Sequence, residues 1–121
     1  MERIRARVDA ALKGVLKDAR GRWLLSGEGH AELALSGVIN GVVESGIMDR
    51  IRVDDDGTHW IVDYKTSTHE GGNRKGFLAA EAERYRDQLA RYSALYCAYA
   101  GVDARCALYF PLLQEFVEVD L

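Results

Sequence analysis

Apolar and polar positions recur with two different periods along the chain, and each period predicts one type of element. In residues 3–18 the apolar positions are spaced by three or four, which is typical of an amphipathic helix that we expect to end near Gly21. The same spacing runs from about Phe77 to Ala100, and Gly101 is suited to end that helix. The pattern therefore predicts an N-terminal helix and a longer central helix.

Shorter segments rich in Val, Ile and Leu predict strands. Three strands or irregular extended pieces are expected early in the chain, at residues 22–26, 31–36 and 38–43. Two more strands are expected after the central helix, at residues 105–110 and 115–119, with a bend at Pro111. The order helix, strands, helix, strands predicts an α/β fold in which helices flank a mixed β-sheet.

A β-hairpin is the clearest feature of the pattern. Residues 47–53 and 59–65 alternate between apolar and polar positions and are joined by Asp54-Asp-Asp-Gly57, which is suited to a tight turn. Residues 66–76 follow, with three glycines and no apolar side chain, and predict a mobile loop before the central helix.

Length and charge limit the functional classes. The 121 residues suffice for one compact domain, and 16 Lys and Arg against 19 Asp and Glu give a net charge of −3. No overall basic field concentrates nucleic acid, so a polyanionic partner must be held locally. No apolar run fits a membrane span or a secretory signal, and we expect a cytoplasmic protein. Cys97 and Cys106 lack metal-site spacing and are expected to be buried free thiols.

Charged side chains meet on one face of the predicted hairpin. With the turn centred on Asp56 or just after it, Asp49 faces Asp63 or Tyr64 on the opposite strand. Lys65 shares the face of Asp63, because side chains alternate along a strand. Opposed carboxylates are destabilising unless a cation neutralises them, and oxygen-only ligation suits Mg²⁺ or Mn²⁺.

This arrangement suggests hydrolytic chemistry, although a simpler interpretation exists. Lys65 could orient or help deprotonate an attacking water, or offset charge on a phosphate. Taken alone, Asp-x-Lys on a hairpin is more often part of a solvated face. The strand neighbours of Asp49 argue against a solvated face, because Ile47, Ile51 and Val53 are expected to point the same way.

Three segments resemble the successive motifs of one nuclease family. They are Gly46-Ile-Met-Asp-Arg-Ile, Trp60-Ile-Val-Asp-Tyr-Lys-Thr-Ser67 and Tyr85-Arg-Asp-Gln-Leu-Ala-Arg-Tyr92. Their order and spacing, over about residues 30–121, are similar to those of RecB-type nuclease domains in the PD-(D/E)XK superfamily, as in the C-terminal domains of RecB and AddA helicase-nuclease subunits. The resemblance implies a restriction-endonuclease-like core and a metal-dependent DNA exonuclease that acts in double-strand-break repair and recombination, with DNA and a helicase domain or subunit as partners.

The resemblance also implies the metal site. Asp49 and Asp63 would be ligands of Mg²⁺ or Mn²⁺, and Lys65 would be the catalytic lysine. The carbonyl of Tyr64 would be a further ligand. Glu32 resembles an upstream acidic position of the family, while its simpler interpretation is an ordinary exposed glutamate.

Four residues are candidates for contacts around that site. Gln88 and Tyr92 match the Gln-x-x-x-Tyr motif of the family and would touch DNA or steady the lysine. At this helical spacing Tyr92 is more often a core residue, whereas a buried Gln88 must find hydrogen-bond partners. Arg74 and Lys75, placed in the predicted Gly-rich loop, are a candidate phosphate clamp, unless that loop is merely solvated.

The sequence also departs from the family pattern. Members usually carry an upstream histidine ligand, but residues 1–20 contain none, and His30, His59 and His69 are not expected to replace it. Members also extend further at the N-terminus, so we expect a C-terminal portion of the family's domain. An alternative is therefore a weak or inactive nuclease-like module that binds DNA or a helicase partner. A third hypothesis is a homo-oligomer, formed when the chain completes its sheet through exposed strand edges or swaps its N-terminal helix.

Overall fold

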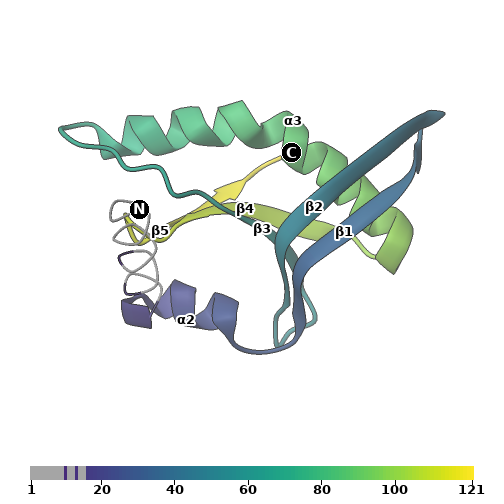
Figure 1. Ribbon diagram of the computed structural model, residues 1–121, viewed down its shortest axis with the longest axis horizontal. Coiled ribbons are helices and arrows are strands. Elements are labelled where there is room, and N and C mark those ends of the chain that lie inside the picture. The colour runs from purple at the N-terminus through teal and green to yellow at the C-terminus, as the bar shows by residue number, and fades with distance from the viewer. Residues whose placement is uncertain (1–9, 11–12, 14–15) are drawn as a thin grey trace, which may run out of the picture.

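The structure is a computed structural model that describes Ala10, Lys13 and residues 16–121. A five-stranded sheet lies between two helices, α2 (Ala19–Leu25) on one face and α3 (Arg74–Ala100) on the other (Figure 1). The strands are, in spatial order, β1 (Gly29–Ile39), β2 (Val42–Val53), β3 (His59–Tyr64), β4 (Ala104–Phe110) and β5 (Glu115–Val119). The predicted mixed sheet with flanking helices is confirmed, whereas the helix predicted over residues 3–18 falls largely outside the described residues.

The sheet topology follows from one crossover. β3 and β4 are parallel, and α3 makes the connection that a parallel pair requires, while all other neighbouring strands are antiparallel. Arg50 lies opposite Val62 in the β2-β3 hairpin, which is the register expected for a turn centred on Asp56. The predicted bend at Pro111 is also confirmed, because a turn separates β4 from β5 there.

Two hydrophobic cores occupy the two faces of the sheet. On the α3 face, Leu89 and Leu95 pack against Ile61 and its neighbours. On the α2 face, Leu24 packs against a cluster that contains Val62. Adjacent β3 residues therefore enter opposite cores, as strand alternation predicts. Among the described residues, no helix is long and apolar enough to cross a membrane.

Several predicted boundaries were wrong, and each has a local cause. Residues 22–26 were expected to be extended but mostly form α2, which buries Leu24 in the core on this face of the sheet. Residues 38–43 are not a separate strand, because Asn40 and Gly41 both have positive φ and form the turn between β1 and β2. Helix α3 begins at Arg74 rather than at Phe77, and the Asn73 side chain caps it by accepting a hydrogen bond from the amide of Gly76.

The sequence also predicts where α3 ends and the state of the two cysteines. Gly101 ends α3 with φ of 75°, as the sequence predicts. Both cysteines are free thiols. Cys106 is buried as expected, whereas the burial predicted for Cys97 was wrong: it is only partly buried, and its thiol donates to Asp103 beyond the end of α3.

The long β1-β2 hairpin bends where the two strands stop pairing regularly. Glu32 has φ of 53°. Glu32 and Asp49 have no partner in the β1-β2 ladder, although the residues on both sides of each are paired. As a result, Met48 and Ile51 enter the same core although they are three residues apart. Ile47 was expected to share the face of Ile51, and this prediction was wrong, since Ile47 is 60% exposed. Beyond the bend, the hairpin projects past α3 (Figure 1).

Candidate active site

Two carboxylates converge where β2 and β3 stop pairing. The last backbone pair on this side joins Arg50 to Val62, and Asp49 and Asp63 lie one residue further along. Asp49 Oδ2 accepts a hydrogen bond from the Tyr64 amide at 2.8 Å, so its side chain replaces the missing backbone partner. The structure thus brings Asp49 and Asp63 together, which is one of the two arrangements that the sequence left open.

The surroundings of Asp49 shift the pKa of its carboxyl group. The pKa of Asp49 is raised from 3.8 to about 6, first because the group is partly buried and then because it hydrogen-bonds to the side chain of Asp63 and is repelled by its charge. The Tyr64 amide and the charge of Lys65 act in the opposite direction. The Asp49 carboxylate is therefore easier to protonate than an ordinary aspartate, and an added cation beside the pair would favour its charged form.

Lys65 lies beside this pair and is held from two sides. Its Nζ is 2.7 Å from Asp63 Oδ2 and 3.6 Å from the ring centroid of Tyr85 on α3, and its side chain is only 17% exposed. The aromatic face therefore stabilises the ammonium and fixes its position. Tyr85 was not among the predicted site residues. The available signal was its position one helical turn before Gln88, on the same face of the helix.

Gln88 and Tyr92 form a pair of their own on α3. Gln88 Nε2 donates a hydrogen bond to the Tyr92 hydroxyl at 2.8 Å. The Tyr92 ring packs on the α3-side core and against the backbone of Gly46, where a Cβ would lie 2.3 Å from Tyr92 Cε1. The glycine is therefore needed for the close approach of the ring. Among the described residues, the ring under Lys65 comes from Tyr85, and no hydrogen bond links the Gln88-Tyr92 pair to the lysine.

Glu32 and Tyr64 border the same open pocket as Asp49. The pocket has a volume of about 310 Å³ and is also lined by Leu25, Ala31 and Arg50. Glu32 is exposed, and within the described part of the chain no three Asp, Glu, His or Cys side chains lie close enough together to ligate one ion. Glu32 therefore faces the same space as Asp49 without joining the convergent pair.

The remaining candidates lie elsewhere. Arg74 and Lys75 are exposed, and they form the first turn of α3 instead of the predicted loop, because Asn73 starts the helix before them. Arg74 lies 3.6 Å from Glu115. The His59 ring is hydrogen-bonded to the Tyr96 hydroxyl, and the His69 ring stacks on Phe77. Both rings therefore have partners within the fold.

The chain matches the family model of the PD-(D/E)XK nuclease superfamily over residues 2–118. It belongs to the PD-(D/E)XK nuclease superfamily. The mixed sheet with a helix on each face agrees with the restriction-endonuclease-like fold of that superfamily. No curated protein matches the chain.

The residues at this PD-(D/E)XK site fit a divalent metal ion, the cofactor typical of the superfamily. The convergent donors are carboxylate oxygens, which Mg²⁺ and Mn²⁺ prefer. The carbonyl of Tyr64 is also suitably directed. The amide of Lys65 bonds to Tyr109 on β4, so alternation along the ladder turns the backbone of Tyr64 away from β4 and toward Asp49. The Tyr64 carbonyl therefore points to the side of β3 on which Asp49 lies, next to the convergent carboxylates.

Proposed function

We propose that this chain is a divalent-metal-dependent deoxyribonuclease domain that hydrolyses phosphodiester bonds. The observation that carries the proposal is the convergence of Asp49 and Asp63. Lys65 lies beside them, between the Asp63 carboxylate and the ring of Tyr85. An isolated surface Asp-x-Lys pair would not bury its lysine or raise the pKa of a neighbouring aspartate. A carboxyl group with a perturbed pKa that borders a pocket, as Asp49 does, is typical of functional sites.

The site residues have two proposed roles: some would hold the metal ion, and Lys65 would position the water or the phosphate. Asp49, Asp63 and the carbonyl of Tyr64 would hold Mg²⁺ or Mn²⁺, with Glu32 reaching the same space from β1. When bound, the ion would polarise the phosphate and lower the pKa of a water. Lys65 would hold the attacking water or offset charge on the phosphate in the transition state.

We further propose residues that would receive the DNA. The Gln88-Tyr92 pair, whose tyrosine is fixed against Gly46, would present a rigid contact surface to the DNA. Arg74 and Lys75 are exposed at the start of α3 and would contact backbone phosphates. Exposed cations suit this task, because counterion release favours phosphate contacts without requiring buried geometry.

The order and spacing of the three motifs support a finer assignment. They favour a RecB- or AddA-type exonuclease that works with a helicase domain or subunit in double-strand-break repair and recombination. A test compares linear double-stranded DNA with the same DNA as a covalently closed circle. An exonuclease degrades the linear form and leaves the circle intact, whereas cutting of the circle would show endonuclease activity.

The decisive experiment removes one charge from the convergent pair. Asp63→Asn should reduce Mg²⁺- or Mn²⁺-dependent cleavage by at least about 10³-fold, because several kcal/mol of transition-state stabilisation are lost. Asp55→Asn is the matched control, since Asp55 lies exposed in the hairpin turn. Both variants should keep the circular dichroism spectrum of the parent. Equal cleavage by a folded Asp63→Asn variant would refute the assignment.

One observation favours a different function. Among the described residues only two carboxylates converge, and Lys65 already neutralises one of them. A nuclease-like module that binds DNA or a helicase partner without turnover could have this arrangement. Thermal unfolding with added Mn²⁺ distinguishes the two. A nuclease should be stabilised by Mn²⁺, and Asp49→Ala should abolish that stabilisation, whereas a binding module should not respond to the ion.

A further inference from the structure

The outer edge of β1 lacks the features that usually protect edge strands. β1 is an outer strand of the sheet and is eleven residues long. Its segment 33–39 contains no charged residue and no proline. Natural sheets usually shorten such edges or place Lys or Pro on them, because unpaired backbone groups otherwise recruit another strand. Among the described residues, no backbone group of another element is hydrogen-bonded to this edge.

The hairpin turn determines which backbone groups are free. Asn40 and Gly41 form a two-residue turn with positive φ at both positions, so Ile39 and Val42 bond to each other at its base. Hydrogen-bonding direction alternates along an antiparallel strand. Counting back from Ile39, every second residue bonds to β2. The N–H and C=O groups of the residues between them point outward: Ala34, Ser36 and Val38.

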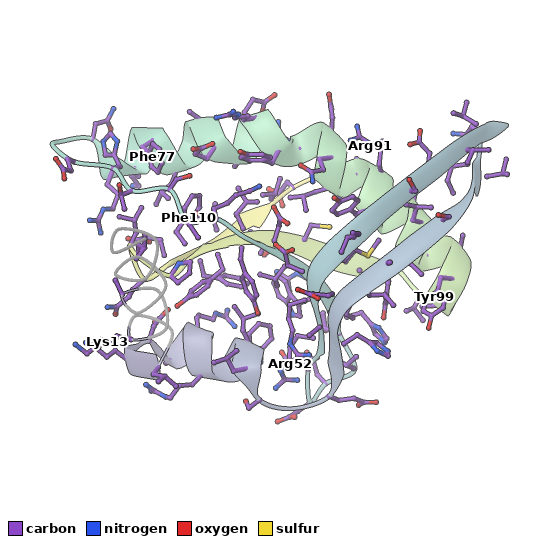
Figure 2. All side chains as sticks on the ribbon, in the orientation of Figure 1. Lys13, Arg52, Phe77, Arg91, Tyr99 and Phe110 are labelled. Atoms are coloured by element: carbon purple, nitrogen blue, oxygen red, sulfur yellow. The ribbon has the colours of Figure 1, made fainter. Side chains whose placement is uncertain are left out.

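An apolar groove runs beside this free edge. It has a volume of about 290 Å³ and lies between β1 and the last turns of α3. Its lining residues are Leu35, Ser36, Gly37, Leu95, Ala98 and Tyr99. Figure 2 shows Tyr99 at the end of α3 next to the β1-β2 hairpin. A strand added to β1 would place alternate side chains in this groove.

We propose that a second copy of this chain pairs its β1 antiparallel with β1, centred on Ser36. In this register Ser36 meets Ser36 of the second copy, and Ala34 meets Val38. This is the centre that pairs all three outward-facing residues with one another.

Size and charge also agree with this register. Leu35 meets Gly37 of the second copy beside the groove, so a large side chain lies over a position without one. Leu33 meets Ile39, which joins two apolar side chains. Glu32 meets Asn40, so no like charges come together, and Glu44 on β2 is already turned toward Arg91 of α3. The strand is therefore complementary to itself in shape and in charge.

The first test is the association state of the 121-residue chain over a concentration series from about 1 µM to 1 mM, a range suited to a small interface. Sedimentation velocity should show a reversible monomer-dimer equilibrium. A chain that stays monomeric over the whole range would overturn the proposal. Larger species or pairing only with a different added chain would also overturn it, because a symmetric edge pair closes as a dimer.

Matched lysine variants test the edge itself. Ser36→Lys places two ammonium groups opposite each other at the centre of the dimer and should raise the dissociation constant at least about fivefold. Ser45→Lys adds the same charge to the same exposed face, because Ser45 is the β2 partner of Ser36, but it lies away from the new edge. Its effect should stay below about twofold. Equal weakening by both variants would contradict pairing through β1.

A mixing experiment tests the register. Residue 36 meets only itself in the proposed dimer, so Ser36→Lys and Ser36→Glu should each be weakened when alone. An equimolar mixture should recover association, because opposite charges then meet at the centre. Both variants should first be checked for a parental circular dichroism spectrum and unfolding temperature. Failure of the mixture of folded variants to recover the dimer would exclude the register centred on Ser36.

Discussion

The two halves of β2 differ in which side chains they bury: the first half exposes apolar side chains, and the second half buries charged ones. In the first half, from Val42 to Ile47, apolar side chains are on the surface, and Val43 is 76% exposed. In the second half, Arg50 and Arg52 are buried, and Asp49 is partly buried. Charged side chains are usually found outside a fold, so the second half requires specific compensation.

The compensation comes from the end of α2. Arg50 Nε donates to the carbonyl of Leu24 at 2.6 Å, and Arg52 Nε donates to the carbonyl of Trp23 at 2.8 Å. The last carbonyls of a helix lack partners within the helix and carry partial negative charge, so the two buried arginines are well matched to them. No described element covers the exposed side of the first half. A strand can therefore bury charged side chains only where neighbouring elements supply partners for them, as α2 does for Arg50 and Arg52.

Removal of a buried arginine is expected to have the largest effect on stability. Arg50→Met keeps the apolar stem but leaves the carbonyl of Leu24 buried without a donor, and this should cost about 3 kcal/mol. Val43→Thr in the exposed half should change stability by less than about 0.5 kcal/mol. Urea unfolding of both variants measures the difference. A loss of similar size at both positions would contradict the proposed distinction between the halves.

The next effect concerns catalysis and depends on the proposed nuclease activity. Tyr85→Leu removes the aromatic face under Lys65 and should lower kcat about 5- to 30-fold, the equivalent of about 1 to 2 kcal/mol, with little change in KM. Tyr85→Phe keeps the ring and should retain nearly parental kcat. Steady-state cleavage of linear DNA gives both constants. If the Phe variant were as slow as the Leu variant, the ring would not be the positioning element.

The pH dependence of stability distinguishes the carboxylates of the two halves. Because the folded chain raises the pKa of Asp49 from 3.8 to about 6, protonation of Asp49 favours folding, and this contribution is lost as pH rises through about 6. Without added metal, Asp49→Asn should therefore be more stable than the parent at about pH 8, by about 1 kcal/mol after allowance for solvent screening.

The same substitution should have little effect on stability at about pH 4, where Asp49 is largely protonated. Glu44→Gln, on the exposed half of β2, is the control and should show no such pH-dependent gain. Urea unfolding at the two pH values measures each difference. A stabilisation by Asp49→Asn that did not depend on pH would contradict the charge-based explanation.

Exposed cations should have the smallest effect. Unlike Arg50 and Arg52, Arg74 and Lys75 are exposed, and their neutralisation should leave stability nearly unchanged. The double variant Arg74→Gln, Lys75→Gln should weaken DNA binding and reduce the dependence of log affinity on log salt by about 1 to 2 units. Fluorescence anisotropy at several salt concentrations measures this slope. An unchanged slope would remove both residues from the DNA contact.

The features predicted well from the sequence are those encoded by short-range patterns. The alternation on both sides of the Asp-Gly turn predicted two possible registers, and the structure has the one that brings Asp49 to Asp63; helical spacing predicted most of α3. The Asn40-Gly41 turn also has a local signal, because an Asn-Gly pair between apolar residues is typical of a two-residue hairpin turn, which contradicts the strand predicted over residues 38–43.

Other features depend on contacts between distant segments. The burial of Arg50 depends on the end of α2, and the environment of Lys65 depends on Tyr85 across the β3-α3 connection. The bend at Glu32 reverses the expected face of Ile47, since one left-handed residue interrupts the alternation. None of these contacts has a period along the chain from which it could be predicted.

The sequence by itself determined the central hairpin, most of the long helix and the two strands after it, and it narrowed the hairpin to two registers, because turn chemistry and side-chain alternation act over a few residues. Only the tertiary structure decided which charges are buried, what holds Lys65 and which strand edge is left free. These properties depend on the helix carbonyls, aromatic rings and neighbouring strands that folding brings together, and a side chain's environment is set by those neighbours.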